Sequence, residues 1–316
     1  MFTCTDADLK ALLDPMQVIA AIRSAFADGL ERVSMPQRLH LETDNGTLLI
    51  MPCAITGDDL CGVKIVSVSR EARPEGRVSA SYMLIETNTS RTIAVFEANY
   101  LTDLRTAATT AVATEILARP DAARLGIFGT GRQAEAHLAM LPRLMNFRQI
   151  LVSGTSATKT AAFVRRMQQR CGWEIQAAAA ETCARSSDVI CTCTSSVEPL
   201  FPGELVRPGT HVNLIGTFQP HAREVDSALI RRVRVFVDTC EAALVEAGDI
   251  LVPLHSGEIG RGHVLGDLHE LVSGVTPGRR SPDEITVFKS VGCALEDLVT
   301  AKLVFEGARS KLGGQG

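Results

Sequence analysis

The chain has 316 residues, of which 46% are hydrophobic, so it can bury a large core, most simply as two domains. Its formal net charge of -4 and its isoelectric point near 6.0 argue against a nucleic-acid partner, which normally requires a basic surface. The cysteines number nine, the first residues resemble no signal segment, and no apolar run reaches membrane-spanning length. We therefore expect a cytoplasmic protein with no membrane partner.

The N-terminal part is expected to begin with two short helices and to continue as strands. Thr5 is suited to cap the first helix, and Asp14 followed by Pro15 supplies a cap and a first-turn proline for the second. Five runs of β-forming residues then predict strands at 36–42, 47–53, 61–69, 79–86 and 92–98. A long helix is expected over 100–122, ending near Pro120, where we place a domain boundary.

Strand and helix patterns alternate after this boundary. Predicted strands lie at 126–129, 149–154, 174–179, 188–193, 211–216 and 233–238, with helical patterns between several of them. This alternation predicts an α/β domain with a Rossmann doubly wound parallel sheet over residues 121–289. A further strand and a capped helix end the chain, and residues 290–316 are expected to join residues 1–120 in a separate α+β domain.

A nucleotide-binding motif opens the predicted parallel sheet. Gly129, Gly131 and Ala134 have the spacing of a glycine-rich turn between a strand and a helix, with Ala134 in place of the usual third glycine. Such a turn lets the backbone approach a pyrophosphate, whose charge is held by free N–H groups and the positive helix end. We therefore assign Gly129, Gly131, Arg132, Gln133 and Ala134 to a dinucleotide-binding site.

The end of the next predicted strand indicates which dinucleotide binds. An acidic residue there usually contacts a free ribose 2′-hydroxyl, but the segment from Ser153 to Lys159 contains no carboxylate. Ser156, Thr158 and Lys159 are suited to surround a 2′-phosphate, which favours NADPH, with NADH as the other possibility. Alternatively, Ser156 or Thr158 merely caps the next helix, which leaves the cofactor preference open.

Lys64 is notable because it lies in a predicted strand that is apolar on both faces. Alternate residues of a strand point to opposite faces, and both sets of side chains in the strand at 61–69 are mainly apolar. This pattern predicts a strand that is buried on both sides. A buried ammonium group needs a charged partner or a cavity, so Lys64 is a candidate catalytic residue. The alternatives are a lysine at a sheet edge that reaches solvent, or a buried ion pair.

Arg105 lies near the start of the predicted long helix, where the helix dipole disfavours a positive charge. Its neighbours are small, and a guanidinium group close to free N–H groups is suited to bind a carboxylate. The alternative is a surface ion pair with Asp103 or Glu97. Arg38, two residues after Pro36, is interpreted from the pattern alone as a solvated residue.

Several long motifs, in the order in which they occur here, resemble those of the ornithine cyclodeaminase / mu-crystallin family over nearly the whole chain. They begin at Val63 (VKIVSV), Leu101 (LTDLRTAA), Gly126 (GIFGTGRQA), His211 (HVNLIGTFQPHAREVD), Glu246 (EAGDILVP) and Asp283 (DEITVFKSVGCALEDL). The resemblance implies a homodimer that joins a nicotinamide-binding Rossmann domain to a substrate-binding and dimerisation domain. It also implies that Arg38 and Arg105 hold a substrate α-carboxylate and that Lys64 lies beside the reacting carbon.

One segment departs from the cyclodeaminase pattern. Cyclodeaminases have a segment that resembles Gly-Gly-Asp-x-Pro, whose aspartate is the proposed acid/base, whereas Phe218 takes that place here. A phenyl ring cannot transfer protons. The chain therefore resembles the reductase branch, which implies reduction of a small cyclic α-imino acid by NAD(P)H. Δ1-Pyrroline-2-carboxylate or Δ1-piperideine-2-carboxylate would then give L-proline or L-pipecolate.

Other functions stay open at this point. They are an open-chain oxo or imino acid as the substrate, as in alanine dehydrogenase or iminosuccinate reductase, ornithine cyclodeamination, and nucleotide-dependent binding without turnover. Thr194, Ser195 and Ser290 complete the assigned cofactor site, and His221 either borders the pocket or lies on a surface loop. The seven histidines are scattered and no cysteine pair has metal-ligand spacing, so we expect no metal site.

Overall fold

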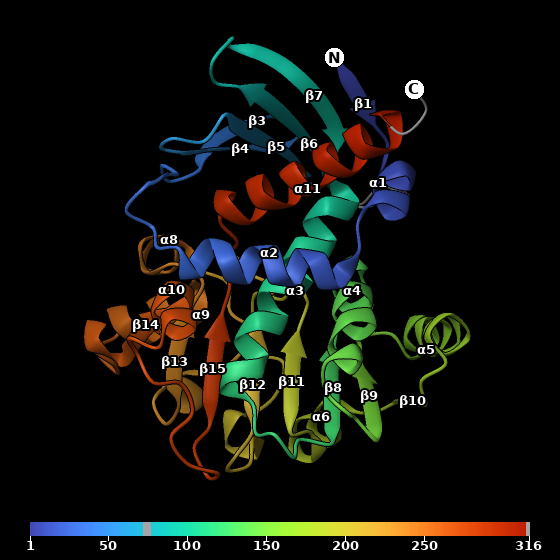
Figure 1. The fold of residues 1–316 in the computed structure, drawn as a ribbon. Helices are drawn as coiled ribbons and strands as arrows, with labels where there is room; N and C mark the ends of the chain where they lie inside the picture. Colours follow the sequence, from blue (N-terminus) through green and yellow to red (C-terminus); the bar gives the residue numbers. More distant parts are fainter. Residues whose placement is uncertain (72–76, 314–316) are drawn as a thin grey trace. The chain divides into compact units, whose positions relative to one another are not determined.

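The structure is a computed structural model that describes residues 1–71 and 77–313 (Figure 1). The chain divides into two compact units, Met1–Thr109 with Gly292–Gly316, and Thr110–Val291. The last three residues of the predicted 290–316 segment lie outside the described residues.

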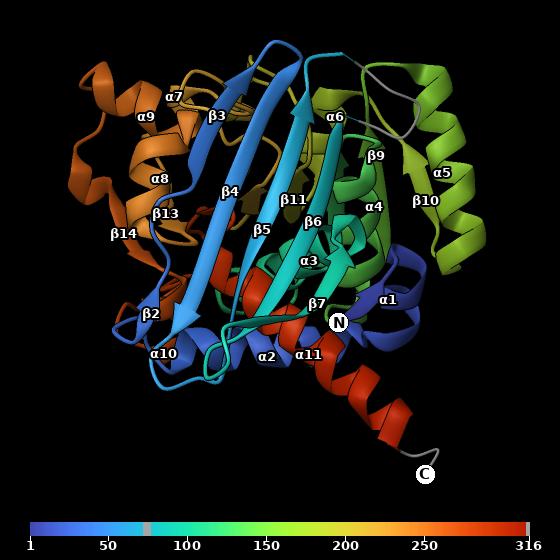
Figure 2. The same cartoon turned by 90° about the horizontal axis from the view of Figure 1, so that it is seen from above.

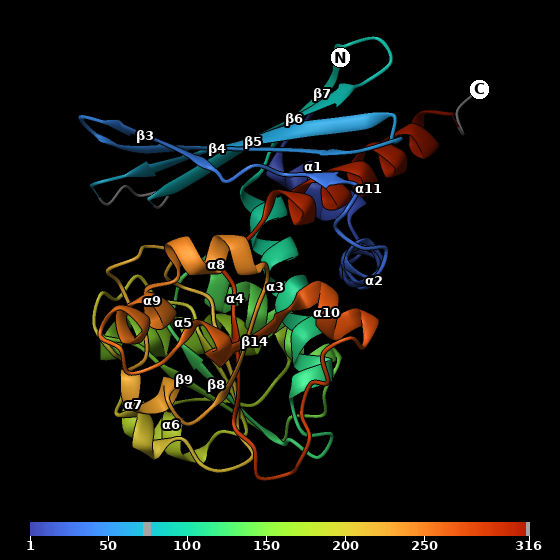
Figure 3. The same cartoon turned by 90° about the vertical axis from the view of Figure 1, so that its left-hand side faces the viewer.

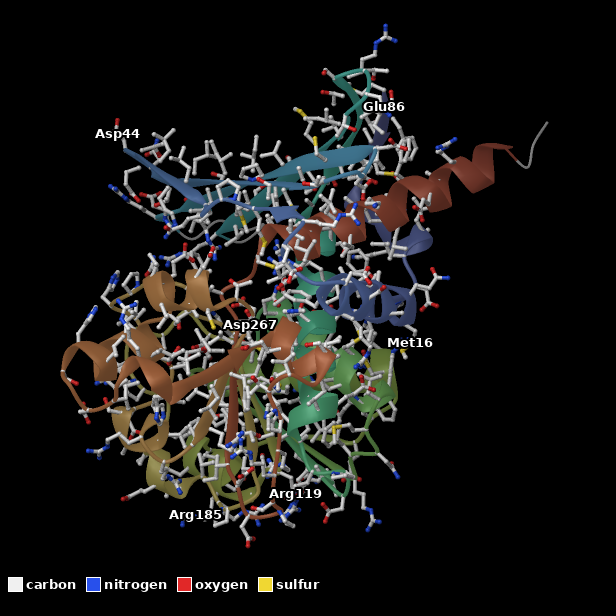
Figure 4. The ribbon with its side chains drawn as sticks, turned by 60° about the vertical axis from the view of Figure 1, so that its left-hand side comes forward. Met16, Asp44, Glu86, Arg119, Arg185 and Asp267 are labelled. Carbon is white, nitrogen blue, oxygen red and sulfur yellow. The ribbon has the colours of Figure 1, made fainter. Side chains whose placement is uncertain are left out.

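The first unit is built on a mainly antiparallel sheet. Its strands are β1 (Phe2–Cys4), β2 (Val33–Ser34), β3 (Leu39–Thr43), β4 (Gly46–Ile55), β5 (Leu60–Ser69), β6 (Val78–Glu86) and β7 (Arg91–Glu97). Its helices are α1 (Asp6–Leu12), α2 (Pro15–Ala27), the first part of α3 (Asn99–Leu117) and α11 (Ala294–Gly313). The sheet order is β1-β7-β6-β5-β4-β2, with β3 also paired to β4 (Figure 2). Asp44 lies in the turn from β3 to β4, and Glu86 ends β6 (Figure 4).

Both predicted N-terminal helices begin where their capping residues indicate. The Thr5 side chain accepts a hydrogen bond from the Asp8 N–H, and the Asp8 carboxylate accepts one from the Thr5 N–H at 2.9 Å, which forms a capping box. The Asp14 carboxylate accepts from the Met16 N–H at 3.0 Å, with Pro15 in the first turn of α2. Such caps typically contribute about 1 kcal/mol each.

Side chains of β5 alternate between a covered and an open face of the sheet. Lys64 points to the covered face, where the strand register sets it between Met51 on β4 and Tyr82 on β6. Helix α11 packs against this face (Figure 3). Ile65 points to the other face and is 37% exposed. The prediction that this strand is buried on both sides is therefore wrong, because no helix in the described part of this unit covers the second face.

The second unit is built on a parallel sheet. Its strands are β8 (Arg124–Phe128), β9 (Gln149–Ser153), β10 (Ile175–Ala177), β11 (Val189–Thr192), β12 (His211–Leu214), β13 (Arg234–Val237), β14 (Val264–Asp267) and β15 (Thr286–Lys289). Its helices are the rest of α3, α4 (Arg132–Met140), α5 (Ala157–Cys171), α6 (Ala180–Ser186), α7 (Ser227–Ile230), α8 (Cys240–Glu246), α9 (Gly248–His255) and α10 (Leu268–Ser273). Short 3₁₀ turns occupy Leu141–Arg143, Gly203–Leu205 and Arg261–His263.

The order of this sheet confirms the predicted doubly wound architecture. The strands run β10-β9-β8-β11-β12-β15-β13-β14, and every neighbouring pair is parallel. The chain reverses its direction of winding between β8 and β11, which is the position where such sheets bind dinucleotides. Helices lie on both faces (Figure 1). The sequence did not predict β14, a short strand that ends at Asp267, the capping residue of α10 (Figure 4).

The second half of α3 belongs to this unit because its threonines bond to buried side chains there. His137 on α4 contacts the Gln133 carbonyl at 2.8 Å and the Thr110 hydroxyl at 2.9 Å. Burial lowers the pKa of His137 to about 4, so the ring is neutral at pH 7. The unit boundary therefore falls between Thr109 and Thr110 and not near Pro120 as the sequence suggested.

A second neutral histidine lies in the same polar network. His211 on β12 contacts the Thr286 hydroxyl at 2.9 Å and the Asn213 side-chain oxygen at 3.0 Å. Asn213 donates in turn to the Thr114 hydroxyl on α3 at 3.0 Å. Burial, and then the positive charge of Arg279, lower the pKa of His211 to about 3.

These two histidines predict a loss of stability in mild acid. Each ring binds a proton more readily in the unfolded chain, near pH 6.5, than in the folded protein. Stability is therefore complete above that pH and falls as the pH drops toward 4. We expect each histidine to reduce the free energy of unfolding by about 2 kcal/mol between pH 7 and pH 5. Urea unfolding at the two pH values measures this change.

His137→Gln should remove about half of that pH dependence, whereas His221→Gln, on the exposed surface, should leave it unchanged. A His137→Gln variant that keeps the full pH dependence contradicts this account.

Candidate active site

The turn after β8 is where the sequence places the pyrophosphate cradle. Gly129 has φ 110°, a left-handed conformation that favours glycine, and a Cβ there would lie 2.6 Å from the Cys193 carbonyl oxygen. Gly131 caps α4, and a Cβ built on it would meet no atom within 4 Å. Ala134 is fully buried in the first turn of α4, so its methyl group permits close helix packing. Open space before the N-terminus of a helix fits the pyrophosphate of a dinucleotide.

The residues that the sequence assigns to the 2′ position of the adenosine ribose lie at the start of α5. Ser156 caps that helix, and its hydroxyl accepts a hydrogen bond from the Lys159 N–H at 3.4 Å. The capping role that the sequence left open for Ser156 is therefore confirmed. Thr158 and Lys159 lie exposed in the first turn of α5, and Arg132 lies exposed at the start of α4.

The other half of the predicted cofactor site is tied to a carboxylate that the sequence analysis missed. The Thr194 N–H and hydroxyl donate to Glu224 at 2.8 Å and 2.7 Å. The Gly216 N–H donates to the same carboxylate at 2.8 Å. Ser195, the next predicted residue, is exposed. Glu224 lies in a polar stretch beside Arg223 and Asp226, so the sequence does not distinguish it from a surface acid.

A second overlooked carboxylate holds the segment after β15. The hydroxyl of Ser290, a predicted cofactor residue, donates to Asp238 at 3.0 Å, and the Val291 N–H donates to the same oxygen at 2.7 Å. Phe218 is half-buried and packs against the hydrophobic core of this unit. His221 is exposed, as expected for a surface loop histidine.

Lys64 lies buried in the first unit and forms an ion pair. Its Nζ donates to Asp297 at 2.7 Å, and only 1% of the lysine side chain is exposed. Burial and the positive charge of Arg105 lower the pKa of Lys64 to about 8, although Asp297 opposes the shift. The ion-pair alternative is thus correct, and the pKa near 8 also suits proton transfer at neutral pH.

Arg105 lies in the second turn of α3 and is also buried. It forms an ion pair with Glu296, and its Nε lies 2.9 Å from Asp297. The sequence suggested a surface ion pair with Asp103 or Glu97. The ion pairs that Arg105 forms here are instead with Glu296 and Asp297. Its acidic partners both come from the first turn of α11, almost two hundred residues along the chain.

Arg38 joins the same cluster through a backbone contact. Its guanidinium donates to the Gly292 carbonyl at 3.1 Å, so Arg38 is half-buried and not the solvated residue that its local pattern predicts. Gly292 has φ 81°, and a Cβ there would lie 2.7 Å from Arg105 Nη1. Only glycine therefore lets the chain pass this close to Arg105.

The three candidate substrate residues are thus brought together by contacts within one unit. We call Arg38, Lys64, Arg105, Glu296 and Asp297 the cation cluster. Three positive side chains against two carboxylates leave one net positive charge. A buried site with one excess positive charge is suited to bind one carboxylate group.

Two absences concern residues 1–71 and 77–313, the described part of the chain. Among these residues, no three His, Cys, Asp or Glu side chains are arranged to hold a metal ion. In the same described ranges, no helix has both the length and the apolar character needed to cross a membrane.

Comparison with known proteins identifies the family. Residues 1–312 match the model of the ornithine cyclodeaminase/mu-crystallin family, and the chain belongs to this family. It is 34% identical over 306 residues to a Δ1-pyrroline-2-carboxylate reductase of Bacillus cereus, covering 95% of this chain and 94% of that protein.

Solved structures agree with this assignment. The Δ1-pyrroline-2-carboxylate reductase of Thermococcus litoralis, in complex with NADH and L-proline, superposes with a TM-score of 0.95 at 35% identity and covers 98% of both chains. An archaeal alanine dehydrogenase dimer with bound NAD superposes with a TM-score of 0.92 at 31% identity, covering 98% of this chain and 97% of that one.

Replacing Lys64 with methionine tests the cation cluster. Lys64→Met nearly keeps the length of the side chain but removes the ammonium group that can donate a proton. We therefore expect kcat to fall on the order of a hundredfold. Cofactor binding, measured by the fluorescence of the reduced nicotinamide, should be unchanged. Lys302→Met is the matched control, because Lys302 forms an ion pair with Asp58 on the same unit outside the cluster. Near-normal turnover in Lys64→Met would refute the role of Lys64.

Proposed function

We propose that this chain reduces a small cyclic α-imino acid, Δ1-pyrroline-2-carboxylate or Δ1-piperideine-2-carboxylate, to the L-amino acid with NAD(P)H. The observation that carries this proposal is the cation cluster, in which two guanidinium groups and one ammonium group of shifted pKa share a buried site. The similarity to Δ1-pyrroline-2-carboxylate reductases over 94% or more of each chain supports the same substrate class.

In the proposed reaction, the cation cluster binds and orients the substrate. Arg38 and Arg105 hold the carboxylate, which fixes the plane of the adjacent C=N bond. Lys64 donates a proton to the imine nitrogen, and Asp297 keeps its Nζ in place at 2.7 Å. The bound nicotinamide supplies the hydride that adds to the imine carbon. One hydride and one proton thus convert the C=N bond to a CH–NH bond.

Because the protonated lysine is the active form, imine reduction should slow as the pH rises through about 8. The reverse oxidation of the amino acid, which needs the neutral amine, should accelerate over the same range. Profiles of kcat/KM against pH in both directions measure this change. A forward profile that stays flat from pH 6 to pH 10 would contradict the assignment of Lys64 as the proton donor.

A substrate panel separates this function from its alternatives. Oxidation of NADPH and of NADH is followed by the loss of their near-ultraviolet absorption with both cyclic imino acids, and with pyruvate or oxaloacetate plus ammonia. With L-ornithine plus the oxidised cofactor, the release of ammonia is measured instead. We expect turnover with a cyclic imino acid. No ammonia release from ornithine is expected, because Phe218 stands where cyclodeaminases have their proposed acid/base aspartate. Activity confined to open-chain oxo acids, or to ornithine, would overturn the proposal.

We further propose that NADPH binds better than NADH. This rests on the hydroxyl-rich segment after β9, which has no carboxylate and ends in the exposed Lys159. Removing the charge in Lys159→Ala should weaken NADPH binding roughly fivefold and leave NADH binding unchanged. Arg165→Ala, an exposed position later on the same helix, serves as the control. Equal weakening of both cofactors, or none, would contradict the preference.

We propose that the chain forms a homodimer through the open face of the sheet in the first unit, the face that carries Ile65. Leu39, Ile50 and Ile65 lie directly opposite one another on the neighbouring strands β3, β4 and β5. Leu39 is 57% exposed and Ile65 is 37% exposed. Apolar surface of this kind is typical of interfaces between subunits. The archaeal alanine dehydrogenase of similar fold is a dimer.

Sedimentation should therefore give about twice the chain mass of 33.9 kDa. Ile65→Glu should shift the protein toward the monomer, whereas Val275→Glu, at an exposed apolar residue of the second unit, should not. A monomeric wild-type protein would rule out the interface.

We also propose a reducing, cytoplasmic location. Its support is the odd cysteine count and the burial of Cys53 and Cys191, which raises the pKa of each thiol to about 12 and keeps it protonated.

A further inference from the structure

Glu224 connects two loops at the carboxyl edge of the parallel sheet. One of its oxygens accepts the Thr194 N–H and hydroxyl at 2.8 Å and 2.7 Å. The other accepts the Thr192 hydroxyl and the Gly216 N–H, both at 2.8 Å. Burial raises the pKa of Glu224, and the charge of Lys289 and the hydrogen bonds from Thr194 and Thr192 oppose that shift. The N–H groups of Thr194 and Gly216 can only donate, so they favour the charged carboxylate.

Two more buried charges lie next to Glu224. The Asp249 carboxylate accepts the Glu224 N–H at 2.7 Å and lies 3.0 Å from Lys289 Nζ. Lys289 also donates to the Thr217 carbonyl at 2.6 Å. Asp249 and Lys289 are at most 1% exposed. Glu224, Asp249 and Lys289, which we call the acidic triad, therefore carry two negative charges and one positive charge.

The position of the acidic triad relative to a bound dinucleotide follows from the sheet. Gly129 and Gly131 follow β8, and the ribose that bears the 2′ position belongs at the end of β9. The other half of the dinucleotide then lies over the ends of β11 and β12. Thr194 and Gly216 follow these two strands, and a Cβ on Gly216 would lie 2.0 Å from the Thr194 carbonyl oxygen. Glu224 thus joins the two segments over which the nicotinamide half of a bound dinucleotide would lie.

We propose that the net negative charge of the acidic triad makes this site bind the oxidised nicotinamide more tightly than the reduced one. The oxidised ring carries a positive charge, and the reduced ring is neutral, so a fixed negative charge nearby stabilises only the oxidised form. When hydride leaves with its electron pair, the charge that appears on the ring is therefore compensated. This inference rests on the proposed NAD(P)H-dependent function.

The test measures binding of both cofactor forms without turnover. Dissociation constants of the reduced and oxidised cofactors are determined by nicotinamide fluorescence and by calorimetry for the wild type and for Glu224→Gln. We expect Glu224→Gln to weaken binding of the oxidised form about fivefold relative to the reduced form. Asp188→Asn is the matched control, because Asp188 is also buried and accepts backbone N–H groups, but at the amino end of β11. Its ratio of dissociation constants should stay at the wild-type value.

The outcomes separate this inference from the proposed function. If Glu224→Gln weakens both forms equally, Glu224 only shapes the loops and the inference is wrong. If the wild-type protein binds neither form, the proposed function itself fails. Should Glu224→Gln not fold, Asp249→Asn removes one negative charge from the same triad, and an unchanged ratio in that variant also overturns the inference.

Discussion

The structure of the first unit depends on the compensation of buried charge. Arg105 and Lys64 are almost completely buried, and a buried cation without a partner would cost several kcal/mol. Both partners, Glu296 and Asp297, come from the first turn of α11. The last helix of the chain must therefore pack against β5 before the lysine is stable. Gly292 permits this arrangement, since its left-handed backbone leaves space for the Arg105 guanidinium.

Each unit holds one buried cluster of charged side chains, and the two clusters have opposite net charge. The cation cluster has one excess positive charge, which suits the carboxylate of an imino acid. The acidic triad has one excess negative charge, which suits a nicotinamide that becomes positive as it donates hydride. In both clusters the charged groups are fixed by hydrogen bonds and ion pairs, so they do not need to reorganise when charge moves during the reaction. Such preorganisation is the main electrostatic contribution of a protein to catalysis.

Local signals in the sequence predicted most of the fold. The capping residues Thr5 and Asp14, the alternating strands and the glycine turn at Gly129 each depend on near neighbours in the chain, and each is present in the structure. The short strand β14 was missed because four residues carry too little periodicity to detect. The open face of β5 was misjudged because alternation tells which residues share a face but not what covers that face.

The candidate site was predictable only in part, for a related reason. Lys64 was recognisable because a lysine within an apolar strand is unusual, and its burial agrees with that interpretation. Its partner Asp297 lies 233 positions away, so no local pattern indicates the pair. Asp238 was missed because an acid at the end of an apolar strand usually reaches solvent, and Glu224 because it lies among other polar residues in a loop. Arg38 was suspected only through the family resemblance, and it lies in the cluster because of the Gly292 carbonyl.

The most direct measurement is a crystal structure of the protein with bound cofactor and L-proline or L-pipecolate. The account predicts that the ligand carboxylate contacts the guanidinium groups of Arg38 and Arg105, and that Lys64 Nζ lies within hydrogen-bond distance of the ring nitrogen. A ligand carboxylate bound away from both arginines, with Lys64 touching only Asp297, would contradict it.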